Sequence, residues 1–193
     1  MTKSKIFGLI LTGGKSSRMG FNKSELSFHG MPQRDFLEQQ LLKFCDAVYV
    51  SCKTPSAGDE NVLPDKFEIE SPLNGILTAM DFSPETAWLT VPIDMPGVNE
   101  HVLRYLLLHR DTKAIATCFL DEDGIKPEPL VTIWEPAAYP LMKAFYQANK
   151  VSPREFLMSV DCRMIIAPNR QFFQNINTPE ELKAYKRLPD QRE

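Results

Sequence analysis

Histidine and cysteine are scarce in this sequence, and their positions exclude the common metal centres built from them. The 193 residues include three histidines and four cysteines. No two cysteines have C-x-x-C spacing, and the histidines do not cluster with them, so a zinc site is not expected. We expect free thiols, buried or half-buried as in a reducing compartment, at Cys45, Cys52, Cys118 and Cys162.

Long apolar runs and an excess of positive charge are also missing. The apolar run Ile6–Leu11 falls far short of the roughly 18 residues of a membrane span. It leads into a segment of glycine, lysine and serine, which is unlike a signal peptide. The net charge of −3 argues against general nucleic-acid binding but leaves room for a small anionic substrate in a local positive pocket. We therefore expect a cytoplasmic protein without a membrane segment.

The composition that is present predicts an ordinary globular domain. Hydrophobic residues make up 43% of the chain and charged residues 24%, which is enough apolar material for a core. No repeat, low-complexity tract or linker divides the sequence. We predict a single domain over residues 1–193.

Strand-like and helix-like segments alternate along the chain. Short apolar runs predict strands at Ile6–Leu11, Asp46–Ser51, Ala87–Val91, Ala114–Phe119, Leu130–Trp134 and Met164–Ile166. Periodicity, proline and cap signals predict helices after Pro32, after Pro72, around Val102–Leu107, at Ala137–Ala148, from Ser152 and from Thr178. Residues 53–67 are predicted to form a loop. The pattern favours an α/β fold of three layers, a mainly parallel central sheet flanked by helices, with ligands bound beyond the carboxyl ends of its strands.

A glycine-rich segment with two positive charges, Leu11–Lys23, follows the first strand. Gly13 and Gly14 let backbone N–H groups approach a ligand, and Arg18 and Lys23 add positive charge, which suits a triphosphate. The segment has neither P-loop nor G-x-G-x-x-G spacing. An ordinary strand–helix turn with surface charges is the alternative.

An aspartate follows the third predicted strand. Asp94 lies between Pro92 and Pro96, where a buried strand emerges. A carboxylate there is suited to Mg²⁺, which prefers oxygen ligands and keeps several waters. It is equally suited to capping a backbone N–H in a turn.

The glycine-rich segment resembles the nucleotide-binding signature of the molybdenum cofactor guanylyltransferase family, L-x-G-G-x-S-x-R-M-G-x-x-K. The matching residues are Leu11, Gly13, Gly14, Ser16, Arg18, Met19, Gly20 and Lys23. Other family elements follow in the same order: Asp65, Ser71–Gly75 for G-P-L-x-G, Asp94–Pro96 for D-x-P, and Asn175–Leu182 for N-x-N-T-P-E-[DE]-L. The resemblance covers nearly the whole chain.

The resemblance implies a Rossmann-like nucleotidyltransferase fold that transfers GMP from GTP to the phosphate of molybdenum cofactor (molybdopterin). It implies catalytic roles for Arg18, Lys23 and Asp94, with Mg²⁺ held by Asp94. The implied GTP-binding residues are Leu11, Thr12, Gly13, Gly14, Lys23, Asp65 and Asp94, and Asn177 would lie near the phosphates and metal. It also implies transient proteins that deliver or receive the labile cofactor.

Two residues of the implied site have ordinary alternatives, and the chain departs from the family pattern at a few positions. Asp65 could accept hydrogen bonds from the guanine edge or be a solvated loop aspartate, and Asn177 could simply cap the last helix. Asn22 and Ser71 depart from the family, as does the pair Gln33-Arg34, where apolar residues are usual.

Two other functions therefore stay open. Related cytidylyltransferases tend to have alanine–glycine where this chain has Gly13-Gly14, so the double glycine favours GTP over CTP. The other is a non-catalytic nucleotide-binding module of the same fold.

Overall fold

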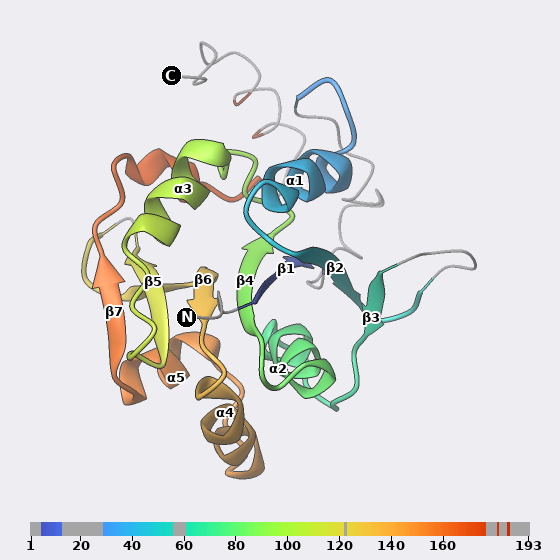
Figure 1. Cartoon of the computed structure of the whole chain (residues 1–193), viewed down its shortest axis with the longest axis vertical. Helices are drawn as coiled ribbons and strands as arrows, with labels where there is room; N and C mark the ends of the chain where they lie inside the picture. Colours follow the sequence, from blue (N-terminus) through green and yellow to red (C-terminus); the bar gives the residue numbers. More distant parts are fainter. Residues whose placement is uncertain are drawn as a thin grey trace.

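The computed structural model describes residues 5–12, 29–55, 61–121, 123–176, 181 and 185, and these form an α/β sandwich of three layers (Figure 1). The strands are β1 (Ile6–Leu11), β2 (Ala47–Cys52), β3 (Val62–Pro64), β4 (Ala87–Pro92), β5 (Ala116–Leu120), β6 (Pro127–Trp134) and β7 (Cys162–Ile165). The helices are α1 (Gln33–Leu42), α2 (Leu73–Phe82), α3 (Glu100–Leu108), α4 (Ala138–Gln147), α5 (Pro153–Ser159) and the 3₁₀ helix η3 (Arg170–Phe173).

The central sheet confirms the mainly parallel arrangement, with one strand reversed. Its order over the described strands is β3-β2-β1-β4-β6-β5-β7. β1 pairs in parallel with β2 and β4, β2 with β3, and β5 with β7, whereas β6 is antiparallel to both of its neighbours. The carboxyl ends of the parallel strands and the beginning of β6 therefore share one edge of the sheet.

Helices cover both faces of the sheet, as predicted (Figure 1). On one face, α1 and α3 bury Leu37, Leu41 and Leu103 against alternate residues of the strands. On the other face, α2, α4 and α5 bury a second cluster around Leu77 and Phe156. Because every second residue of a buried strand points to the same side, β1 and β4 contribute to both clusters.

The helix-start signals in the sequence are confirmed where the structure describes them. Ser152 accepts a hydrogen bond from the backbone N–H of Glu155 (3.2 Å), and Pro153 occupies the first turn of α5. Pro140 lies in the first turn of α4, where its missing N–H costs nothing. The expected helix from Thr178 begins outside the described residues.

Two element predictions were incomplete. Residues 53–67 are not wholly a loop, because Val62–Pro64 adds the edge strand β3 to the end of β2. A three-residue strand is too short to show periodicity. β6 begins at Pro127 rather than Leu130. The two prolines at its start do not fit the apolar strand pattern, so the sequence did not predict that the extended segment continues to the end of the sheet where the parallel strands terminate.

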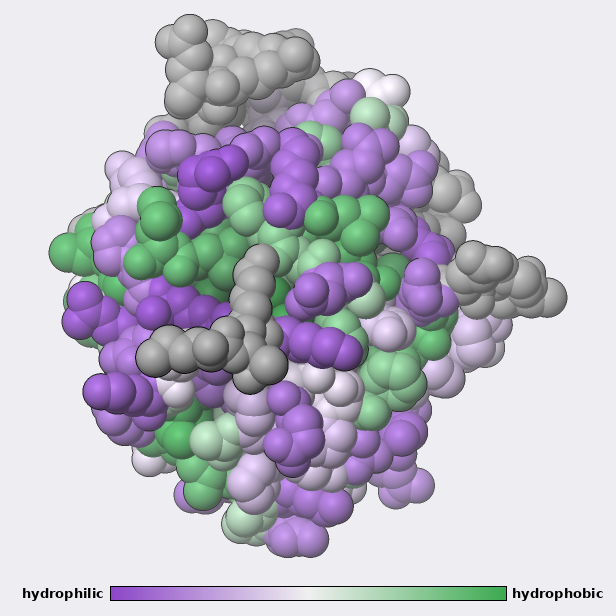
Figure 2. Space-filling view, viewed as in Figure 1, coloured by the Kyte–Doolittle hydropathy of each residue, from purple (hydrophilic) through white to green (hydrophobic). Residues whose placement is uncertain are grey.

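The four cysteines are free, as predicted: Cys45 and Cys118 are buried, and Cys52 and Cys162 are half-buried. Burial raises the pKa of the Cys45 thiol to about 12, so this thiol stays protonated at neutral pH. Within the described ranges, no helix has the length and apolar character needed to cross a bilayer. On the face shown in Figure 2, hydrophobic side chains are interspersed with hydrophilic ones, as is usual for a protein surface.

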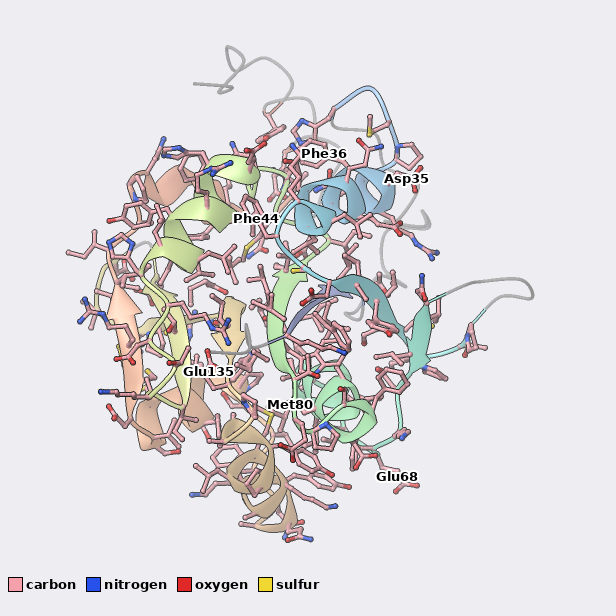
Figure 3. The ribbon with its side chains drawn as sticks, viewed as in Figure 1. Asp35, Phe36, Phe44, Glu68, Met80 and Glu135 are labelled. Atoms are coloured by element: carbon pink, nitrogen blue, oxygen red, sulfur yellow. The ribbon has the colours of Figure 1, made fainter. Side chains whose placement is uncertain are left out.

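A buried ion pair supports the α3–β5 connection at the end of the sheet opposite the carboxyl ends of the parallel strands. The Arg110 guanidinium donates to both carboxylate oxygens of Glu135, with N–O distances of 2.6 and 2.8 Å. Glu135, labelled in Figure 3, is only 4% exposed. Bidentate geometry of this kind stabilises the pair while both partners are present.

Candidate functional site

The ends of β1, β2 and β3 are joined into one polar cluster. The Thr12 N–H and hydroxyl both donate to the Ser51 carbonyl. The Ser51 hydroxyl donates to Asp65 Oδ1 (3.0 Å), and the Asp65 N–H donates to the Cys52 carbonyl (2.9 Å). Thr12 and Asp65 are thus fixed at the same edge of the sheet, one on each side of Ser51.

Gly75 allows α2 to approach this cluster closely. A Cβ atom at this position would lie 2.2 Å from the Ser51 Oγ and 3.0 Å from the Leu11 Cδ2. Only a residue without a side chain fits there without moving Ser51. The final glycine of the S-P-L-N-G motif is therefore explained by packing against Ser51, which holds Asp65, and against Leu11 at the end of β1.

Asn74 holds the chain that follows Asp65. Its carbonyl oxygen accepts from the Phe67 N–H (3.1 Å), and its amide donates to the carbonyls of Phe67 and Ile69. The Thr78 hydroxyl accepts from the Lys66 N–H (3.0 Å). These bonds come from one turn of α2, so the helix sets the position of the 65–69 segment.

The environment of Asp65 is partly desolvated. Burial raises the pKa of this carboxyl above its usual value, although the Ser51 hydrogen bond and the nearby Lys53 charge oppose the shift. A half-buried carboxylate with one oxygen held by a hydroxyl retains acceptor capacity for a ligand. Two adjacent N–H donors, such as those on the edge of guanine, would suit it.

Asp94 lies just beyond β4, next to β1 in the sheet. The Ile93 N–H donates to the Leu11 carbonyl (3.1 Å), which ties this turn to the end of β1. The Asp94 carbonyl accepts from the Ile176 N–H (2.8 Å), so the chain just before Asn177 also meets this edge. Asp94 itself is half-buried.

Among the predicted site residues, the structure thus places Leu11, Thr12, Asp65 and Asp94 at the same end of the sheet, with Thr12 and Asp65 linked through Ser51. The other predicted site residues are Gly13, Gly14, Arg18, Lys23 and Asn177, and they lie outside the described residues.

Sequence reasoning missed a second carboxylate at this edge, Glu128. It is 6% exposed at the start of β6, and its Oε1 accepts from the Leu130 N–H (2.9 Å). Burial raises its pKa, and the negative charges of Asp121 and Asp94 add to the shift, whereas the Leu130 hydrogen bond and the Arg154 charge oppose it. No motif marks it, because only the reversed direction of β6 brings residue 128 beside residue 94.

Arg154 balances part of this negative charge. Its guanidinium lies 3.8 Å from Asp121 Oδ2 and 3.9 Å from Glu128 Oε2, both of which are at the same edge. The structure places it at the start of α5, directed to two carboxylates.

The carboxylates at this edge suit a divalent metal ion shared with a substrate. Among the described residues no group of three or more His, Cys, Asp or Glu side chains forms a dedicated metal cage. Mg²⁺ is commonly bound through one or two carboxylates together with substrate phosphates and water. A half-buried Asp94, with Glu128 near enough to raise the local negative charge, fits that mode.

Ser71, one of the departures from the family pattern, has a local structural role. Its hydroxyl donates to the Val151 carbonyl (2.6 Å) and accepts from the Leu73 N–H (3.1 Å) at the start of α2. The residue links α2 to the segment before α5. The substitution therefore adds a bond between two elements of this edge rather than removing a charged group.

The fold and this edge define a nucleotidyltransferase: a mainly parallel α/β sheet, a glycine-rich segment after the first strand, and carboxylates at the neighbouring strand ends. The chain belongs to the MobA-like NTP transferase domain family, which it matches over residues 8–162.

Relatives extend the match over most of the chain. A molybdenum cofactor guanylyltransferase of Xanthomonas euvesicatoria pv. vesicatoria is 32% identical, over 90% of each chain. One from Ectopseudomonas mendocina is 26% identical, over 96% of this chain and 94% of the other. A molybdenum cofactor biosynthesis bifunctional protein of Synechocystis is 32% identical over 94% of this chain, which spans about half (54%) of that longer protein.

Solved structures agree on the fold. Molybdopterin-guanine dinucleotide biosynthesis protein A from Archaeoglobus fulgidus superposes with a TM-score of 0.74 at 19% identity, covering 93% of this chain and 96% of the other. The 2-C-methyl-D-erythritol 4-phosphate cytidylyltransferase of Francisella tularensis gives 0.64 at 12% identity, covering 94% and 98%. At these identities the likeness concerns the fold alone.

Proposed function

We propose that this protein transfers GMP from GTP to the phosphate of molybdenum cofactor, giving the guanine dinucleotide form and pyrophosphate. The observation that carries the proposal is the strand-end cluster, in which Ser51 fixes Asp65 beside Thr12 while Asp94 lies at the adjacent strand end. The guanylyltransferase names of relatives that align over nearly the whole chain support the same substrates.

The nucleotide would lie across this edge with its base near β3 and its phosphates near β4. Asp65 accepts hydrogen bonds from the guanine N1–H and N2–H₂, a pair of donors that adenine does not have. Leu11, Thr12, Gly13 and Gly14 present their backbone to the nucleotide at the end of β1. Because Asp65 carries a negative charge beside the base, an edge with two donors is favoured over an edge of acceptors.

Positive charge and a divalent metal would serve the phosphates. Arg18 and Lys23 neutralise the triphosphate and the charge that develops on the departing pyrophosphate. Asp94 would hold Mg²⁺, with Asn177 nearby, and the bound ion would supply electrostatic stabilisation of the phosphate oxygens. Nucleotidyltransferases usually require a divalent metal, and Mg²⁺ is the ion that we assign to this site.

The reaction is an in-line displacement without a covalent enzyme intermediate. An oxygen of the acceptor's phosphate forms a bond to the α-phosphorus of GTP while the bond to the β-phosphate oxygen breaks. A phosphate monoester is largely ionised near neutral pH, so the reaction needs no strong general base. The protein's main tasks are to position the two substrates and to stabilise charge.

The test is transfer of α-labelled GMP, together with pyrophosphate release, in the presence of the acceptor and Mg²⁺. Asp94→Asn and Lys23→Ala should each lower the rate by about 10²–10³. Glu85→Gln is a matched control for Asp94→Asn, because Glu85 is exposed in the turn before β4, at the opposite edge of the sheet. Wild-type turnover in either site variant would refute the assignment.

Nucleotide choice in the same assay separates the remaining functions. CTP-dependent transfer would keep the fold and chemistry but make the protein a cytidylyltransferase. Nucleotide binding without pyrophosphate release would make it a non-catalytic module.

The proposal extends to the setting of the reaction. Residues 1–193 act as one nucleotidyltransferase domain, because a single sheet supports both core clusters. The reaction takes place in the cytoplasm, and transient partner proteins deliver or receive the labile cofactor.

A further inference from the structure

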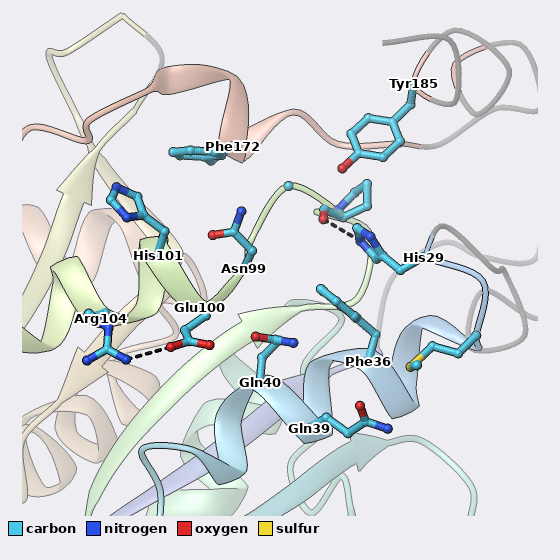
Figure 4. Close-up of a pocket in the computed structure, with 13 residues that line it drawn as sticks. His29, Phe36, Gln39, Gln40, Asn99, Glu100, His101, Arg104, Phe172 and Tyr185 are labelled. Carbon is cyan, nitrogen blue, oxygen red and sulfur yellow. Dashed lines mark hydrogen bonds and ion pairs between the residues drawn. The ribbon is translucent and has the colours of Figure 1, made fainter. Parts of the chain in front are cut away.

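A cavity of about 620 Å³ opens between α1 and the beginning of α3, on the opposite face of the sheet from α2 (Figure 4). The segment after Asp94 contributes Pro96 and Gly97 to its wall. Its volume lies within the range of small-molecule sites. The polar cluster around Asp65 does not contribute to the wall, so this is a separate site.

Aromatic rings form two sides of the cavity. The His29 ring stacks on Phe36 with centroids 3.8 Å apart and planes 20° apart, and a ring nitrogen of His29 lies 3.0 Å from the Pro96 carbonyl oxygen. Phe172 lies on another side, and Gly97 permits this because a Cβ there would be 2.9 Å from the Phe172 backbone. Such surfaces favour a flat ring, since aromatic stacking adds to the area buried.

Amide groups provide hydrogen-bond donors between these rings. The Asn99 Oδ1 is already used, because it accepts from the Val102 N–H (3.2 Å) as the cap of α3. The Gln40 Oε1 likewise accepts from Lys43 Nζ (3.1 Å). Each side chain therefore keeps its NH₂ group as the donor available to a ligand, which must bring carbonyl or ring-nitrogen acceptors.

Among the described residues, the charged side chains along the cavity are paired rather than predominantly positive. Glu100 pairs with Lys43 (2.7 Å) and with Arg104 (2.6 Å). A neutral heteroaromatic ring fits this wall better than a phosphate group would. The cavity is also close to the reaction centre, since Gly97 follows Asp94 by three residues, at most about 11 Å along the chain.

We propose that this cavity binds the pterin ring of the acceptor, stacked against the His29–Phe36 pair with its carbonyl and ring nitrogens facing Asn99 and Gln40. The assignment rests on the proposed function, whose two substrates each carry a ring with an amino-oxo-pyrimidine edge. Guanine is assigned to Asp65 on the α2 face, so the second ring takes the α1–α3 face. The acceptor's phosphate then points toward Asp94.

The test uses pterin itself, a fluorescent ring without a phosphate, titrated into the full chain with and without saturating GTP. Asn99→Asp keeps the α3 cap, because aspartate also accepts from the Val102 N–H, but it removes the NH₂ donor. We expect pterin affinity to fall about 10-fold, as for the loss of one hydrogen bond. Phe36→Leu, which removes the stacking partner, should weaken it similarly. Gln147→Glu adds the same charge on exposed α4 and should change nothing.

GTP binding, measured by calorimetry on the same variants, separates this inference from the proposed function. Pterin binding that persists with GTP bound and weakens only in the two cavity variants supports the site. No pterin binding, equal binding in Asn99→Asp and wild type, or guanosine displacing pterin from the cavity would each overturn it. Failure of GTP to bind would count against the proposed function. The pterin titration of the cavity variants would still support or overturn the pterin site by the outcomes given above.

Discussion

Replacement of Gly75 by alanine is the sharpest test of how the strand-end cluster is built. An alanine Cβ would lie 2.2 Å from the Ser51 Oγ, 2.8 Å from the Ser51 Cβ and 3.0 Å from the Leu11 Cδ2. Ser51 is only 3% exposed and its hydroxyl is held by Asp65, so it cannot rotate away without losing that bond.

The expected cost follows from two opposing effects. Overpacking of this kind typically destabilises a protein by about 1–3 kcal/mol. Alanine is a better helix former than glycine by up to about 1 kcal/mol, which offsets part of the cost at this position of α2. We expect a net loss of about 1–2 kcal/mol, which lowers the Tm by roughly 2–8 °C in a chain of this size.

Thermal and urea denaturation of a double-mutant cycle would isolate the contact. Ser51→Gly removes both clashing atoms of that residue, so Gly75→Ala should cost little or even stabilise the protein in that background. The coupling energy between the two substitutions should exceed about 1 kcal/mol. A Gly75→Ala protein as stable as wild type, or a coupling near zero, would refute the packing explanation.

Three further predictions concern stability. Gln33 is fully buried at the start of α1, and neither atom of its amide group has a hydrogen-bond partner in the described part of the chain. Gln33→Leu should therefore stabilise the protein by about 1–2 kcal/mol, as measured by urea denaturation. A loss of stability would contradict this. Glu135→Ala leaves the buried Arg110 charge unpaired and should cost about 3–5 kcal/mol by the same method; a change below 1 kcal/mol would show that the pair matters little. The folded-state pKa of Asp65 is raised, so the charged form of this side chain opposes folding. Asp65→Asn should therefore be more stable than wild type at neutral pH, and the difference in stability should shrink as the pH falls through that pKa toward 4. A stability difference that does not depend on pH would exclude this cause.

The layer architecture was predictable because it depends on periodicity. Buried runs such as Ile6–Leu11 and Ala87–Val91 are apolar on both faces, and alternation with helices requires a mainly parallel sheet. Both tryptophans, Trp88 and Trp134, lie in predicted strands and are fully buried. Local chemistry also located the start of α5 at Ser152.

The features that the sequence did not predict depend on contacts between residues far apart in the chain. Nothing near β6 in the sequence shows that the strand runs antiparallel, and that direction alone brings Glu128 to the edge occupied by Asp94. The bond between Ser51 and Asp65 joins two strand ends 14 residues apart and has no motif. The α1–α3 cavity likewise combines residues such as His29, Asn99 and Phe172, which are far apart in the sequence.

Calorimetric titration of the purified protein with GTP, CTP, ATP and UTP, with and without Mg²⁺, tests most directly whether this end of the sheet is a GTP site. We expect a clear preference for GTP that strengthens when Mg²⁺ is present, and loss of that strengthening in Asp94→Asn. Preference for CTP would contradict the assignment of the base to Asp65, and no binding of any nucleotide would contradict the site as a whole.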